Sequence, residues 1–188
     1  MKPAAIAAFL LATSAAAAGA AAPTFKSDPC SLLTGKEVES VQKEKVASAK
    51  ASEPSRDRFA VSQCFYTLPT FSKSVSLEVT RHRPGASDSP RDQWKQMFAR
   101  AMEKASEREQ EEEREAGEAT QRARETAAKP RPVSGLGDEA YWVGTSLGGG
   151  LYVLKGDAYV RLSVGGPDPE NVKVEKLTKL ARPLLRRL

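Results

Sequence analysis

The first residues of the chain most strongly restrict what the remainder can become. Residues 1–22 place Lys2 before an apolar run over 4–11, and the alanines that follow end at Ala22, just before Pro23. A positive start, a short apolar stretch and small residues at its end are typical of a secretory signal peptide. The apolar stretch is too short and too rich in alanine to cross roughly 30 Å of hydrocarbon. We therefore expect a signal peptide over 1–22 and a secreted or periplasmic mature chain.

Export gives the two cysteines a simple role. Cys30 and Cys64 are the only cysteines in the sequence, and an oxidising compartment favours a disulfide between them. Closing a loop of roughly 35 residues stabilises a domain by about 3 to 4 kcal/mol. The alternative is a reactive cysteine paired with His82, but no residue near either cysteine indicates a lowered thiol pKa. With one histidine and two cysteines, neither a conventional zinc site nor another cofactor is expected.

The charge of the chain is mild and mixed. There are 29 Lys and Arg against 24 Asp and Glu, which gives a net charge of +5 and an isoelectric point near 9.2. A nucleic-acid-binding protein usually gathers its positive charge on one face, and these charges are interleaved. The sequence after the leader contains no further run of about 20 apolar residues. We expect no nucleic-acid partner, and no stable membrane insertion after signal cleavage.

Alternating apolar and polar residues predict several strands. Val75, Leu77 and Val79 fall on every second position of 74–80, the period of a strand with one buried face. Gly156 and Asp157 suit the central positions of a type II′ turn, which predicts a hairpin. The predicted strands are 59–68, 74–80, one reached through a turn within 133–143, 151–154 and 158–164. Residues 42–58 and Gly148 to Gly150 are interpreted as loops, although the glycines would also suit a flexible lip over a ligand pocket.

Helical periodicity appears in three places. Thr34 and Glu37 have the spacing of a capping box, which predicts a short helix with Leu33, Val38 and Val41 facing inward. From Asp92 onward the apolar residues recur at helical spacing, which indicates an amphipathic helix that faces the core or, alternatively, a partner. A last helix over 169–188 has a leucine stripe that would cover a sheet rather than lie on a membrane, and Pro183 should kink it.

The segment 103–132 differs from the rest of the chain. Alanine is its only apolar residue type, and charged side chains crowd it, so it cannot build a core of its own. We interpret it as a charged, helical, low-complexity insertion that acts as a solvated extension, with a docking arm as the alternative. The whole pattern predicts an α+β fold: one antiparallel sheet covered by helices on one face, forming a compact sandwich. Residues 23–188 would form this single domain.

Three segments carry a resemblance to a known family. Residues 28–34 (DPCSLLT), 64–66 (CFY) and 135–142 (GLGDEAYW) together resemble secreted or lipid-anchored bacterial envelope proteins of unknown function. The resemblance implies a compact α/β sandwich outside the cytoplasm with its two cysteines bridged, and it implies no catalytic residues. This chain departs from the family in lacking a cysteine suited to lipidation and in carrying the charged insertion.

Motifs for catalysis are weak. Gly135, Gly137 and Ala140 match a dinucleotide-binding spacing, but neither a preceding strand nor a following helix is predicted there. His82 lies between two arginines and has no carboxylate to orient it. Asp138 and Glu139 are adjacent in a strand, so their side chains would point to opposite faces and could not flank one bond. We expect a protein that is not an enzyme.

The remaining hypothesis is binding. We expect a non-enzymatic binding protein of the cell envelope, with an envelope protein or a small ligand as partner. Its candidate binding surface comprises Trp142, Tyr159 and Arg161, together with the turn that leads to Trp142. The alternative is a periplasmic inhibitor or immunity-type protein whose charged segment blocks a partner enzyme. A hydrolase is a third class, and it would lose turnover on His82→Ala.

Overall fold

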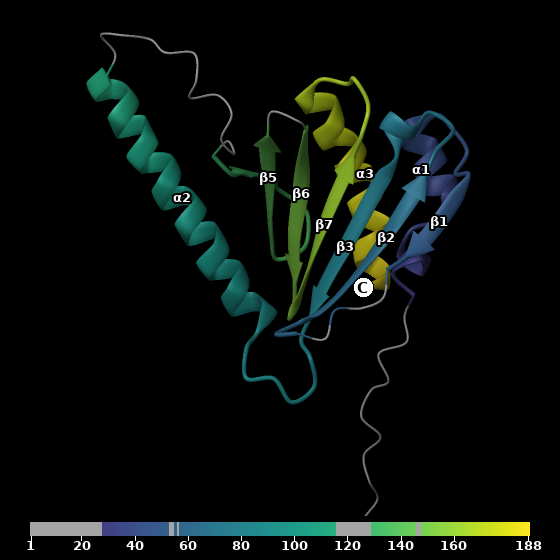
Figure 1. The fold of residues 1–188 in the computed structure, drawn as a ribbon, viewed down its shortest axis with the longest axis horizontal. Helices are drawn as coiled ribbons and strands as arrows, with labels where there is room; N and C mark the ends of the chain where they lie inside the picture. Colours follow the sequence, from purple (N-terminus) through teal and green to yellow (C-terminus); the bar gives the residue numbers. More distant parts are fainter. Residues whose placement is uncertain (1–27, 53–54, 56, 116–128, 146–147) are drawn as a thin grey trace, which may run out of the picture.

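A computed structural model describes residues 28–52, 55, 57–115, 129–145 and 148–188. They form a seven-stranded antiparallel sheet with three α-helices and two short 3₁₀ helices (Figure 1). The strands are β1 (Ser48–Ala51), β2 (Ala60–Thr67), β3 (Val75–Arg81), β4 (Arg131–Pro132), β5 (Glu139–Thr145), β6 (Gly148–Lys155) and β7 (Ala158–Val164). The helices are η1 (Pro29–Leu32), α1 (Gly35–Gln42), η2 (Phe71–Lys73), α2 (Pro90–Glu115) and α3 (Glu170–Arg187). The predicted signal peptide, 1–22, lies outside the described residues.

The sheet consists of two halves, β1 to β3 and β4 to β7, which meet at its centre where β3 pairs with β7. Its strand order is β1-β2-β3-β7-β6-β5-β4, and every neighbouring pair is antiparallel. β3 pairs with β7 from Val75 opposite Val164 to Arg81 opposite Ala158. The prediction of an α+β fold with one antiparallel sheet covered by helices is thereby confirmed.

One face of the sheet carries the main core. Strand residues at alternate positions are buried there beneath α1, α3 and η1, which lie behind the sheet in Figure 1. Burial of aliphatic side chains at about 25 cal/mol per Å² is the main force that holds these layers together. The central members are Leu77, Val79, Leu151, Val153, Val160, Leu162, Leu177, Leu180 and Leu184. The inward positions predicted for Leu33, Val38 and Val41 are confirmed by their burial.

The predicted disulfide is confirmed, and it fastens the N-terminal segment to the sheet. Cys30 in η1 is bonded to Cys64 in β2. Beside it, the Tyr66 hydroxyl lies 3.2 Å from the carbonyl oxygens of both Cys30 and Leu33 and donates to them. Burial raises the pKa of Tyr66 to about 12, so this phenol remains a neutral donor at physiological pH.

An ion pair connects α1 to the end of α3. Arg187 donates to both carboxylate oxygens of Glu37, at 2.8 and 2.7 Å, and also to the carbonyl of Leu32 at 2.9 Å. Glu37 also completes the predicted capping box with Thr34. The hydrogen bonds from Arg187 are the main cause that lowers the pKa of Glu37 to about 2. The ion pair therefore joins α1 to the end of α3 while the carboxylate is ionised.

We predict that ionisation of the Glu37 carboxylate makes the free energy of unfolding depend on pH in the acid range. The pKa of Glu37 is about 2 when folded and 4.5 when unfolded, so its contribution is complete above pH 4.5 and is lost as the pH falls towards 2. Allowing for solvent screening, the contribution is on the order of 1 to 2 kcal/mol. Urea unfolding at pH 6 should show Glu37→Gln less stable than wild type by that amount, and the gap should narrow to about a quarter of it near pH 2.5. Glu39→Gln, in the same helix, is the control; a gap that stays undiminished at pH 2.5 would contradict the linkage.

On the second face of the sheet, the start of α2 is the helical segment that packs there among the residues that the structure describes. Trp94 and Phe98 pack on Tyr141 and Tyr159, with ring centroids 4.5 to 5.9 Å apart between helix and sheet. The Trp94 indole nitrogen donates to Glu139 at 2.9 Å. We call Trp94, Phe98 and these three sheet residues the α2 anchor. Beyond it, α2 runs away from the edge of the sheet (Figure 1).

Three segments differ from the sequence interpretation. Ser48–Ala51, within the predicted loop 42–58, forms the edge strand β1, and Gly148 to Gly150 open strand β6 instead of forming a loop. Arg131–Pro132, at the end of the predicted insertion 103–132, form the short strand β4, which pairs with β5. β1 (SAKA) has no large apolar residue that would reveal a strand in the sequence; its main-chain pairing with β2 holds it in place. The predicted turn at Gly156 is present, and its positive φ of 59° suits glycine. The charged segment is helical as far as Glu115, and 116–128 lie outside the described residues.

Candidate functional site

The open face of the sheet is hollowed next to the α2 anchor, and Tyr152 adjoins both, since it lines the hollow and its ring centroid lies 5.8 Å from that of Phe98. A groove of about 420 Å³ lies there, where β5, β7 and β2 end and β6 and β3 begin, at the top of Figure 1. This volume is within the usual range for small-molecule sites. We call it the open-face groove, and its lining consists of Phe65, Phe71, Ser72, Ser74, Ser76, Val143, Thr145, Gly148, Gly149, Gly150, Tyr152, Arg161, Ser163, Val164 and Gly165.

Hydrogen-bonding side chains form the floor of the open-face groove. The Nε of Arg161 donates to the Tyr152 hydroxyl at 3.0 Å. One residue pair further along the same face, the hydroxyls of Ser76 and Ser163 lie 2.7 Å apart across β3 and β7. Because these side chains come from adjacent antiparallel strands, the sheet itself fixes their spacing.

Two exposed phenyl rings form one wall of the groove. Phe65 and Phe71 are 39% and 69% exposed, and they are the large hydrophobic side chains that the described residues leave most open to solvent. Their ring centroids are 6.0 Å apart. An exposed aromatic pair beside a groove is characteristic of a surface that contacts a ligand or a partner.

A buried polar contact holds the Phe71 turn in place. Gln42 donates to the carbonyls of Lys73 and Gly165, and its own carbonyl accepts from Lys176 at 2.9 Å. A Cβ at Gly165 would lie 2.0 Å from the Ser72 carbonyl oxygen, so only glycine allows this close approach. The wall of the groove is therefore fixed by the core beneath it.

The glycines at the start of β6 keep the groove open. A Cβ at Gly150 would lie 3.2 Å from the Arg161 Nε, on the groove side. On the opposite face, a Cβ at Gly149 would lie 2.3 Å from the ring of Trp142. Sequence analysis favoured a loop for these glycines and kept a lip over a ligand pocket as the alternative. They form part of strand β6 rather than a loop, and they line the groove as that alternative expected.

Of the three predicted binding residues, only Arg161 reaches the groove. Trp142 is 2% exposed and belongs to the main core, so its prediction as a contact surface is corrected by its burial. Tyr159 is 7% exposed beneath Trp94, and burial raises its pKa. Tyr159 was selected on the wet face of the hairpin sheet and Trp142 at the end of the 135–142 turn, and both side chains are instead buried.

The residues weighed for catalysis each make contacts that support the fold. His82 lies 3.1 Å from the carbonyl of Ala86, beyond the end of β3. Asp138 accepts from Arg91 and from the Gly156 amide, and Arg91 is the main cause that lowers its pKa. Glu139 accepts from Trp94. Among the described residues, no group of three or more His, Cys, Asp or Glu side chains is placed to hold a metal ion.

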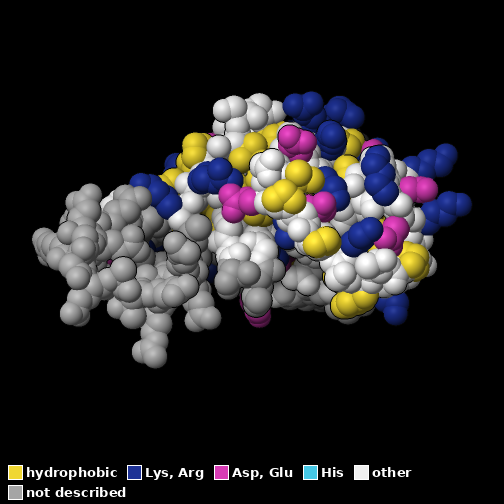
Figure 2. All heavy atoms as spheres, turned by 90° about the horizontal axis from the view of Figure 1, so that it is seen from above, with side chains coloured by type: hydrophobic (Ala, Val, Ile, Leu, Met, Phe, Trp, Pro, Cys, Tyr) yellow, Lys and Arg dark blue, Asp and Glu magenta, His cyan; other side chains and the backbone are white. Residues whose placement is uncertain are grey.

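The comparisons with known proteins give no relative. No family model, curated protein or solved structure matches the chain significantly. Within the described part of the chain, no helix has the length and apolar character needed to cross a bilayer. Viewed from above (Figure 2), hydrophobic side chains lie among both basic and acidic ones, without a large area of one charge on the visible surface.

Proposed function

We propose that this chain is a non-enzymatic binding protein of the extracytoplasmic space that captures an envelope component in the open-face groove. The groove is the observation that carries the proposal, since it combines a suitable volume, an exposed aromatic wall and a polar floor. Pockets of this kind, apolar with a few well-placed polar groups, are the default binding sites of a fold. The leader-like residues 1–22, the Cys30–Cys64 disulfide and the resemblance to envelope proteins support export.

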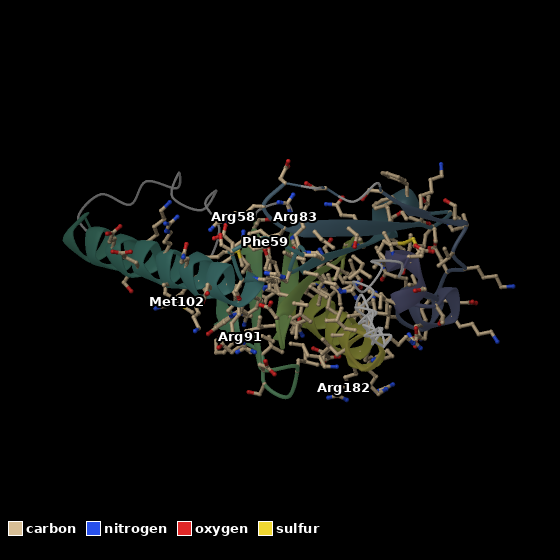
Figure 3. All side chains as sticks on the ribbon, turned by 90° about the horizontal axis from the view of Figure 1, so that it is seen from below. Arg58, Phe59, Arg83, Arg91, Met102 and Arg182 are labelled. Carbon is tan, nitrogen blue, oxygen red and sulfur yellow. A yellow bond between two sulfur atoms is a disulfide. The ribbon has the colours of Figure 1, made fainter. Side chains whose placement is uncertain are left out.

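We predict that Phe71→Asp abolishes capture. Phe71 is 69% exposed, so the substitution should leave the fold unchanged while placing a charge on the wall of the groove. Immobilised oxidised protein is incubated with envelope extract, and the retained components are identified by mass spectrometry. The wild type should retain a component that the variant loses. Arg182→Gln, on α3 at the far side of the sheet (Figure 3), is the control and should retain it. Equal retention by Phe71→Asp would contradict a role for the groove.

A second candidate function rests on α2. The helix is held by its anchor and then continues beyond the sheet edge to Glu115 (Figure 1), as an arm that contacts another protein would. This geometry supports the inhibitor or immunity-type alternative, in which the arm blocks a partner enzyme. The same capture with residues 107–127 deleted distinguishes the two, because loss of the partner from a folded deletion variant favours the arm and retention favours the groove.

A further inference from the structure

The polar groups on the floor of the open-face groove are arranged to donate hydrogen bonds. Tyr152 accepts from the Nε of Arg161, so the phenolic hydrogen of Tyr152 remains available. Ser76 and Ser163 share a single hydrogen bond, and one of their two hydroxyl hydrogens is therefore also available. The two Nη groups of Arg161 add further donors. Such a cluster matches an acceptor with several lone pairs.

Arg161 gives the lining of the groove a positive charge. Among the described residues that line it, Arg161 is the charged one, and none of them carries a carboxylate. Glu78 lies opposite Arg161 in the β3–β7 register, but its carboxylate accepts a hydrogen bond from the Gln63 side chain on β2, at 2.7 Å. Among the described residues, Arg161 forms no ion pair with a carboxylate of this chain. Lys50 lies opposite Phe65 in the β1–β2 register, so its positive charge is on the same face of the sheet.

The apolar wall lies at a fixed distance from this charge. Arg161 and Phe65 are two strands and two residue positions apart, because Arg161 pairs with Glu78 and Glu78 with Gln63. With ~4.8 Å between strands and ~3.4 Å per residue, their Cα atoms are about 12 Å apart. A ligand that contacts both must therefore carry its anionic group a short chain away from its apolar group.

We propose that the open-face groove binds a small amphipathic oxyanion: a carboxylate or phosphate held by Arg161, Tyr152 and the serine pair, with an aryl or alkyl group against Phe65 and Phe71. This inference rests on the proposed function and specifies its ligand class. The guanidinium presents paired donors that match the geometry of a carboxylate or a phosphate. The phenyl rings remove apolar surface of the ligand from water.

The test compares three matched probes by isothermal titration calorimetry with the full-length, oxidised protein. These are 4-phenylbutyrate, its neutral isostere 4-phenylbutyramide, and 3-phenylpropyl phosphate, which carries a phosphate in place of the carboxylate. At least one anion should bind about tenfold or more tightly than the amide, since charged hydrogen bonds are the stronger ones. The preferred anion shows whether the natural source is an acid or a phosphate. Equal binding of all three probes, or binding of none, would overturn the proposal.

Variants separate the anionic contact from the apolar one. Arg161→Gln should weaken binding of the preferred anion about tenfold or more while leaving the amide unchanged. Phe71→Ala should weaken anion and amide alike, and Arg182→Gln should affect neither. Circular dichroism spectra that superimpose on wild type establish that each variant is folded. If Phe71→Asp abolishes capture from envelope extract but Arg161→Gln leaves the capture and the probe affinities intact, the oxyanion assignment fails and the binding function remains.

Discussion

Substituting alanine for both Cys30 and Cys64 is expected to lower the free energy of unfolding by about 4 kcal/mol. The two cysteines are 34 positions apart, and a loop of that length gives about this value in the chain-entropy model. In the folded state the bond holds η1 against β2, and the Tyr66 hydroxyl and the Glu37 to Arg187 ion pair depend on the placement of the same segment. Urea unfolding monitored by circular dichroism measures the loss.

Reduction supplies the control for this prediction. Dithiothreitol should bring the wild-type unfolding midpoint close to that of the double alanine variant, and it should leave the midpoint of the variant unchanged. Freshly isolated native protein should also resist alkylation of its thiols, because the described residues contain no free cysteine. A wild-type midpoint that does not respond to the reductant would mean that the bond contributes little to stability.

The sequence predicts the parts of this fold that follow from local alternation. Val75, Leu77 and Val79 are buried as their period required, and Val160 and Leu162 likewise place Arg161 on the opposite face. A period of two assigns residues to faces, but it does not tell which strands will pair. The central pairing of β3 with β7 brings together segments far apart in the chain, and no local pattern specifies it.

The candidate site could not be predicted from the sequence, because it depends on which strands pair. Arg161 and Phe65 meet at one groove only because β3 lies between their strands, with Ser76 and Glu78 beside them. Trp142 looked like a surface aromatic, yet it packs in the core in the space that Gly149 leaves open. A glycine run is a poor strand signal, since glycine in a strand costs entropy and packs no side chain. Here Gly149 has no side chain, and this allows the close approach of the Trp142 indole ring.

The two helical layers differ in how much of their packing could be predicted from the local sequence. The leucine stripe of α3 predicted its packing on the sheet, and the core confirms this. The apolar positions of α2 predicted an amphipathic helix but not where it packs on the sheet. Among the side chains that the structure describes, the large buried ones of this helix are Trp94 and Phe98, in its first nine residues. Their aromatic contacts, together with the hydrogen bonds of Arg91, hold the start of α2 on the sheet, so a single substitution there should have a large effect.

Trp94→Ala should accordingly have one of the largest effects of any single substitution in the chain. The side chain is fully buried, contacts three aromatic rings and donates to Glu139. Truncating a buried tryptophan costs about 3 to 5 kcal/mol, and the Glu139 carboxylate also loses its partner. Chemical denaturation measures the loss, and amide hydrogen exchange should show faster exchange along α2 than along β3.

Lys95→Ala is the matched control, because Lys95 is the next residue in the same helix and its side chain is 65% exposed. It should change the free energy of unfolding by no more than about 0.5 kcal/mol. Trp142 is the only other tryptophan, so its fluorescence in the Trp94→Ala variant reports on the main core alone. Native-like Trp142 emission together with rapid exchange in α2 would show that the anchor holds the helix independently of the core. A loss below about 1 kcal/mol would mean that α2 is held by contacts other than the α2 anchor, because the sheet would then retain the helix without its central ring.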